Sequence, residues 1–241
     1  MAIDAFLEHD SQNNRIPLAR LEETRREIDH ITDGLNLTID EGIREAVAVL
    51  RALTVATTQS CEGHLDRGSP SPYIDISAPG EPGHRFQGEK AQLEELAKKH
   101  DIAADEITTW PIEEYRAQRA EAAWQEWQQW TADQSREETT EYETWEQMNI
   151  RYLSAVRKLL EEFYSMRPKP PADRLLLDDG RLRIRSALYD QYFAVALAGN
   201  QNALASTDRE RLRILLPGYQ AEMQAFIDFL KNKFFEAAPE A

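Results

Sequence analysis

The sequence predicts a mainly helical α+β domain, in which amphipathic helices cover a small antiparallel or mixed sheet of three or four strands. Apolar residues recur at intervals of three and four over several long segments, which is the spacing of one helix face. Short β-branched or alternating segments, and a hairpin pattern around Asp179-Gly180, supply the strands. The length of 241 residues fits a single domain over 1–241, with 89–135 as a helical elaboration.

Composition and charge exclude several classes of partner. Hydrophobic residues make up 41% of the chain and charged residues 29%, and the formal net charge is −15. A surface this acidic repels phosphate backbones and anionic lipids, so we expect no nonspecific nucleic-acid binding and no membrane binding. The chain shows no signal-peptide pattern and no apolar run near the ~18 residues of a membrane span. One cysteine leaves no internal disulfide, so we expect a soluble cytoplasmic protein.

Two helices and a strand are expected first along the chain. Apolar residues at helical spacing predict a helix over 18–33. Thr38 and Glu41 form a capping-box pattern, in which each side chain bonds the other residue's free backbone N–H, and they predict a second helix over 38–53. The β-branched run that follows predicts a strand over 54–59.

A second short strand and an acidic region come next. Alternating isoleucines predict a strand over 73–77, which interrupts a Gly/Pro-rich loop over 63–88. That loop is either a lid over a pocket or a plain connector. Residues 110–146 combine many acidic residues with tryptophans, three of which, Trp124, Trp127 and Trp130, recur at every third position. They form either a partner surface or, as we favour, tryptophans packed under a solvated acidic face.

The strongest helix pattern in the chain covers 141–166. Thr140 and Glu143 form a capping-box pattern at its start, and a heptad stripe with one polar member, Asn149, runs along it. A buried asparagine at that position would fix the register of a helix pair. The stripe consists of Tyr142, Trp145, Asn149, Tyr152, Val156, Leu159 and Phe163.

The last part of the chain predicts a β-hairpin and further helices. The hairpin joins 174–178 to 181–185 through a two-residue type I′ turn at Asp179-Gly180, with Arg183 on its polar face. The expected apolar pairs are Leu177 with Leu182 and Leu175 with Ile184. Helices are expected over 187–235, with a bend or a break at Pro217-Gly218.

The candidate site is the loop at the end of the first strand, with the sequence Ser60-Cys61-Glu62-Gly63-His64. Cys61, His64 and Glu62 are the candidate catalytic residues, because an imidazole that takes the proton of a thiol makes a nucleophilic thiolate. Gly63 lets the backbone approach an anion closely, which fits ligand binding without chemistry. The structural alternative is a small buried cysteine at a strand end and a histidine that caps a turn.

A metal is a third chemistry for this loop. Cys61 and His64 have the Cys-x-x-His spacing that can chelate one ion. A metal site needs more ligands, and near the loop in sequence only His84 and either Asp75 or Asp66 qualify. We therefore assign no metal from the sequence.

Five residues are candidate ligand-binding groups. Arg183 is expected to lie in the same sheet as the loop, where it would face a bound phosphate or carboxylate. A solvated outer sheet face is the alternative for this arginine, and the one we favour. The five candidates are Ser60, Gly63, Tyr73, Asp75 and Arg183.

The segment Thr57-x-x-Ser60-Cys61-Glu62-Gly63-His64, followed by Pro72-Tyr73-Ile74-Asp75, resembles a Thr-x-x-Ser-Cys-x-Gly-His motif of uncharacterised bacterial and phage proteins. It is also similar to the Thr-x-Ser-Ser-Cys-Ser-Gly-Arg segment of the tRNA wybutosine-synthesising methyltransferase family, which has an arginine at the position of His64. The resemblance is confined to this short segment. It implies that Ser60, Cys61 and Gly63 line a ligand-binding loop.

Two classes of function follow from the sequence. The first is a small-molecule or nucleotide-binding protein acting at the Ser60–His64 loop, with catalysis through Cys61 and His64 as its stronger form. The second is a protein-interaction module or inhibitor acting through 110–146, and a homodimer is compatible with it. In the first class, substitutions at Cys61 and His64 remove function and leave the fold intact; in the second they do little. The sequence identifies neither the reaction nor a cofactor.

Overall fold

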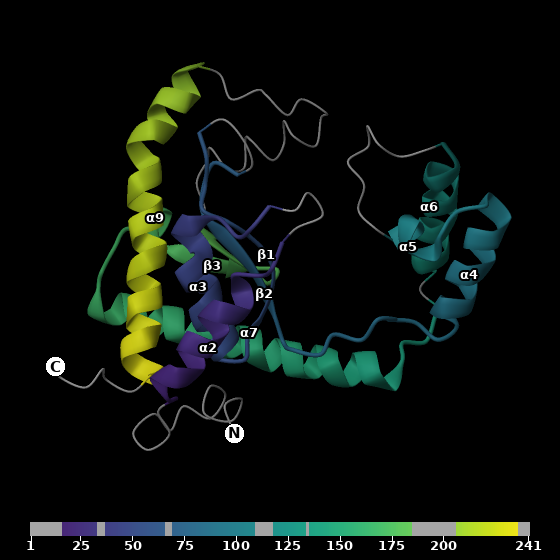
Figure 1. Ribbon diagram of the computed structural model, residues 1–241, viewed down its shortest axis with the longest axis horizontal. Helices are drawn as coiled ribbons and strands as arrows, with labels where there is room; N and C mark the ends of the chain where they lie inside the picture. Colours follow the sequence, from purple (N-terminus) through teal and green to yellow (C-terminus); the bar gives the residue numbers. More distant parts are fainter. Residues whose placement is uncertain are drawn as a thin grey trace. The chain divides into compact units, whose positions relative to one another are not determined.

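The structure is a computed structural model, and it describes residues 16–32, 37–65, 69–108, 118–133, 135–184 and 206–235. Two compact units divide the chain, the first within Met1–Pro79 and Asn149–Ala241 and the second within Gly80–Met148. Helices dominate, and the first unit also holds one four-stranded antiparallel sheet (Figure 1). The predicted mainly helical α+β class is therefore confirmed.

The sheet lies in the first unit, and its strands follow the order β1-β2-β4-β3 with every neighbouring pair antiparallel. The strands are β1 (Ala56–Cys61), β2 (Tyr73–Ser77), β3 (Leu175–Asp178) and β4 (Arg181–Ile184). The β3–β4 hairpin has the predicted register, with Leu175 opposite Ile184 and Leu177 opposite Leu182. Asp179 and Gly180 have φ values of 44° and 79°, which agrees with the predicted type I′ turn.

Helices α2 (Leu18–Ile28) and α3 (Glu41–Ala52) precede the first strand in the sequence and pack against each other. Helix α2 ends earlier than predicted, and 33–36 lie outside the described residues. The predicted capping box of α3 is wrong. The N-cap of α3 is Asp40, whose side chain makes no capping bond, because Thr38 pairs instead in an extended bridge with Thr32.

Helix α7 (Thr140–Met166) carries the predicted stripe, and its part in the first unit forms much of the core. Tyr152, Val156, Leu159 and Phe163 are all buried. The cap of α7 is one residue earlier than predicted, since the Thr139 hydroxyl accepts the Tyr142 N–H. Asn149 does not fix a helix pair, because its Oδ1 accepts the Ala78 N–H at 2.9 Å, just beyond the end of β2. The 3-10 helix η2 (Pro171–Asp173) leads from α7 into the hairpin.

Helix α9 (Ser206–Phe234) lies alongside α3 (Figure 1). Of the predicted bend or break at Pro217-Gly218, the break is wrong, because α9 continues through Pro217. An internal proline costs ~3 kcal/mol. Burial of Leu216, Met223 and Phe226 on either side of it offsets that cost, since each such side chain contributes ~1.5–3 kcal/mol. The part of the predicted helical region over 187–205 lies outside the described residues.

The second unit consists mainly of α4 (Glu89–His100), α5 (Ala104–Thr108) and α6 (Gln118–Thr131). Its core contains Leu93, Leu96, Ile107, Ala123 and Trp127. Trp130 stacks on Trp127 at 5.0 Å between ring centroids, and the Arg136 guanidinium lies 3.6 Å from the Trp130 centroid. These rings therefore pack within the unit, as favoured from the sequence; Trp110 lies outside the described residues. Among the helices the structure describes, none is long and apolar enough to cross a membrane.

Candidate functional site

The loop after β1 is held in place by a glycine in the left-handed region. Gly63 has a φ of 85°, and a Cβ added to it would lie 2.6 Å from Cδ1 of Leu216 on α9 and 3.0 Å from the Pro72 nitrogen. Any side chain at this position would therefore strain the backbone, because of the positive φ, and would collide with Leu216 and Pro72. Gly63 therefore allows the loop to pack directly against α9.

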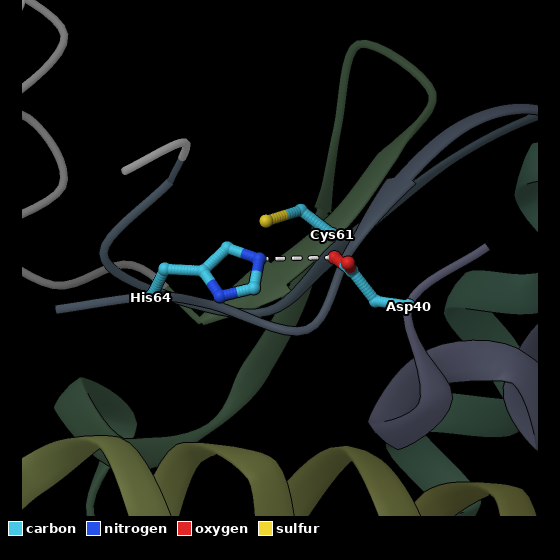
Figure 2. A group of neighbouring side chains, drawn as sticks. All are labelled: Asp40, Cys61 and His64. Carbon is cyan, nitrogen blue, oxygen red and sulfur yellow. Dashed lines mark hydrogen bonds and ion pairs between the residues drawn. The ribbon is translucent and has the colours of Figure 1, made fainter. Parts of the chain in front are cut away.

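Asp40 reaches this loop from the start of α3, and its carboxylate contacts His64 and the backbone of Glu62. Its Oδ2 lies 3.1 Å from Nε2 of His64 and accepts the Glu62 N–H at 3.3 Å. Figure 2 shows the carboxylate of Asp40 and the thiol of Cys61 both near the ring nitrogen of His64 that faces Asp40. One donor atom from each of these three residues lies within 4.8 Å of the other two.

Glu62 supplies the capping bond that Asp40 does not make. Its Oε2 accepts the N–H of Gly42, in the first turn of α3, at 2.6 Å. A Cβ on Gly42 would lie 2.6 Å from the same oxygen, so glycine leaves the room that the carboxylate needs. The positive end of the α3 dipole stabilises the charges of Asp40 and Glu62 at this position.

His64 is held through one ring nitrogen and through its backbone. Nε2 faces Asp40, and Nδ1 lies 3.9 Å from Oε1 of Glu62. The backbone N–H of His64 donates to the Ser69 carbonyl at 2.8 Å, and the side chain is only 13% exposed. Both ring nitrogens thus lie near carboxylates.

Cys61 is a buried thiol, 7% exposed, whose Sγ accepts the Gly63 N–H at 3.4 Å. Burial raises the pKa of this thiol, and the negative charges of Asp40 and Glu62 raise it further, whereas the backbone N–H groups of Gly63 and Ser69 lower it. A free thiolate is therefore disfavoured at neutral pH. The catalytic roles expected for Cys61, His64 and Glu62 stay predictions.

A groove of about 430 Å³ opens beside the loop. It is lined by Gly63, His64, Leu65, Arg209, Arg213 and Leu216. Arg209 and Arg213 lie one turn apart on α9, and Arg213 also donates to Glu210 at 2.6 Å. Sequence reasoning missed both arginines, because nothing near them marks a site until α9 packs beside the loop.

The predicted ligand-binding residues of the sheet fall into two groups. Cys61 lies opposite Tyr73, and Tyr73 lies opposite Arg183, so these three form one row across the sheet. Asp75, in contrast, receives two hydrogen bonds from Arg181.

Ser60 lies opposite the buried Ile74 and outside that row. The side chain of Arg183 is 12% exposed and donates to Asp178 at 2.9 Å, so it does not lie on the solvated face that we favoured. Its contact with a ligand stays a prediction.

Asp40 is the main site residue that sequence reasoning missed. It is separated from Glu62 by 22 positions and sits in what looks like an ordinary helix cap. Comparison with protein-family models, curated proteins and solved structures gave no match. The resemblance of the Ser60–His64 segment to other families therefore stays an expectation.

Proposed function

We propose that the protein binds a small molecule carrying a phosphate or carboxylate group, in the groove between the Ser60–His64 loop and α9. The observation that carries this proposal is the pair Arg209 and Arg213, which line the groove together with His64. A nucleotide falls within this ligand class through its phosphates.

The charge distribution supports an anionic ligand. The chain carries a net charge of −15, and Arg209 and Arg213 place two cationic side chains on one wall of the groove, where Arg213 also pairs with the exposed Glu210. Guanidinium groups match the planar geometry of carboxylates and phosphates, and each such charge-assisted bond contributes ~1.5–3 kcal/mol. A volume of about 430 Å³ lies in the range of small-molecule sites, which is roughly 300–1,000 Å³.

The loop supports the same proposal from the other wall. Gly63 brings backbone close to the groove without a side chain, and His64 adds a polar group whose ring is already fixed. Such preorganisation lowers the entropy lost on binding. The raised pKa of Cys61 gives no support to nucleophilic attack by a free thiolate, so the proposal is binding and not covalent catalysis.

Mass spectrometry of the native protein tests this function. The wild type is purified gently, and small molecules are released from it by denaturation and identified. Arg213→Gln serves as the test variant and Arg211→Gln, which does not line the groove, as the matched control on the same helix.

We expect an anionic compound in the wild type and in Arg211→Gln, and its loss in Arg213→Gln. An uncharged or cationic compound, or equal retention in both variants, would overturn the proposal. The alternative, an interaction protein acting through 110–146, stays a prediction: Trp127 and Trp145 are buried, which does not favour it.

A further inference from the structure

We propose that Asp40, Cys61 and His64 bind one divalent transition-metal ion of the zinc class. This inference goes beyond the proposed function and does not depend on which anion the groove takes. Its basis is the convergence of a carboxylate oxygen, a sulfur and an imidazole nitrogen within 4.8 Å of one another.

The spacing of these atoms suits one ion. Zinc lies ~2.0–2.3 Å from nitrogen, oxygen and sulfur ligands, so two ligands of a tetrahedral ion are ~3.5 Å apart. Oδ2 of Asp40 and Nε2 of His64 are already 3.1 Å apart, and Sγ of Cys61 is within 4.8 Å of both residues' donor atoms. The sulfur would have to move toward the other two donor atoms to reach the ~3.5 Å spacing of a tetrahedral ion.

The surrounding groups are placed to orient these ligands. A metal-bound histidine usually donates its other ring N–H to a carboxylate, and here the Glu62 carboxylate lies 3.9 Å from Nδ1 of His64, close to but beyond hydrogen-bond distance. Glu62 is itself fixed by the Gly42 N–H at 2.6 Å. The Glu62 N–H orients Asp40, and the Gly63 N–H donates to the Cys61 sulfur.

The donor set identifies the class of ion and the kind of site. Thiolate and imidazole ligands favour zinc and similar ions over magnesium and calcium. Three protein ligands leave a fourth position for water or a ligand, which is the pattern of catalytic and not of structural zinc sites. Binding replaces the thiol proton of Cys61 with the metal ion, and the proton is released to solvent.

Two titrations of the full-length protein test the inference, both without phosphate or any other groove ligand. In the first, Zn²⁺ is titrated against a chromogenic chelator with the wild type and with Asp40→Asn, Cys61→Ser and His64→Gln. His84→Gln is the matched control, because His84 is exposed and lies in the second unit. In the second, Co²⁺ replaces Zn²⁺, and the absorption spectrum reports a sulfur ligand through its charge-transfer band.

We expect one Zn²⁺ per chain and a cobalt–thiolate band in the wild type and in His84→Gln. Each ligand variant should bind Zn²⁺ at least ~10-fold more weakly, and Glu62→Gln ~10–100-fold more weakly. Arg213→Gln should bind metal as the wild type does, which separates this inference from the proposed function.

Absence of Zn²⁺ binding in the wild type, or Co²⁺ binding without the sulfur band, would overturn the inference. Both of these results are obtained with the wild type, so the test remains decisive even if a ligand variant does not fold. Unchanged affinity in a folded Cys61→Ser protein would overturn it equally.

Discussion

Glu62, and not the N-cap residue Asp40, caps helix α3, while the Asp40 carboxylate binds the backbone N–H of Glu62. Asp40 is the N-cap residue of α3, yet its carboxylate accepts the Glu62 N–H at 3.3 Å and not an N–H of its own helix. Glu62, from the end of the sheet, caps α3 through the Gly42 N–H at 2.6 Å. These two bonds tie the helix to the loop and place an oxygen of Asp40 beside His64.

Gly42→Ala tests the cap that Glu62 provides. Alanine favours a helix over glycine by up to ~1 kcal/mol, but its Cβ would lie 2.6 Å from Oε2 of Glu62 and displace it. Loss of a hydrogen bond to a charged group costs ~1.5–3 kcal/mol, so we expect a net fall of about 1 kcal/mol in the free energy of urea unfolding.

Gly218→Ala is the control for that substitution. Gly218 lies inside α9, and a Cβ there has no other atom within 4 Å. Gly218→Ala should therefore show only the higher helix propensity of alanine, and we expect it to raise the free energy of unfolding slightly. If Gly42→Ala stabilised the protein as much as Gly218→Ala, the contact between Glu62 and α3 would not contribute to stability.

The hairpin turn gives a second prediction. Gly180 has a φ of 79°, and a Cβ on it would lie 2.9 Å from the Ile76 carbonyl oxygen. Gly180→Val should therefore lower the free energy of unfolding by at least ~1–3 kcal/mol, since a β-branched residue resists positive φ. Gly80→Val, with a φ of 74° but no neighbour within 4 Å, measures the backbone strain alone. An unchanged thermal melt of Gly180→Val would contradict the type I′ turn.

A third prediction concerns the pH dependence of stability at Glu222, which is 1% exposed. Burial alone would raise the pKa of Glu222, but hydrogen bonds from Lys169, Arg167 and Tyr164 outweigh it and hold the pKa below its usual value of 4.5. A carboxyl whose pKa is lower in the folded than in the unfolded state stabilises the protein above the unfolded pKa. That contribution is lost as the pH falls through the folded pKa.

Glu222→Gln should accordingly lower the free energy of urea unfolding by ~1–3 kcal/mol near pH 7. The difference in this free energy between the variant and the wild type should shrink at pH values below 4.5. Asp228→Asn, an exposed change on the same helix, should shift stability by less than ~0.5 kcal/mol at either pH. A difference for Glu222→Gln that stays constant with pH would contradict the ionised state of Glu222.

How far the sequence predicts this protein depends on how local the interactions are. The β3–β4 register was predictable because Leu177 and Leu182 are near neighbours in sequence and the turn residues select the geometry. The continuity of α9 through Pro217 was not predictable from the sequence. Burial of the neighbouring apolar side chains in the core outweighs the helix-breaking tendency of proline there.

The site divides in the same way. Cys61, Glu62 and His64 were predictable as close neighbours in sequence, and the structure keeps them together. The predicted strand over 54–59 is shifted, because β1 covers Ala56–Cys61, so Ser60 and Cys61 end the strand and only Glu62 to His64 lie in the loop after it. Asp40 and Arg213 come from α3 and α9, and only the packing of these helices on the loop brings them in. A helix-capping aspartate and an exposed arginine on a helix are both common, so neither residue could be recognised as part of a site from the sequence.

A ³¹P NMR titration of inorganic phosphate, with succinate as a competing carboxylate, measures anion binding in the groove directly. We expect the wild type and Arg211→Gln to bind phosphate with the same affinity. Arg213→Gln should bind phosphate at least ~10-fold more weakly, as loss of one charge-assisted bond of ~1.5–3 kcal/mol requires. Equal affinities of Arg211→Gln and Arg213→Gln, or no binding of either anion by the wild type, would contradict an anion site between the Ser60–His64 loop and α9.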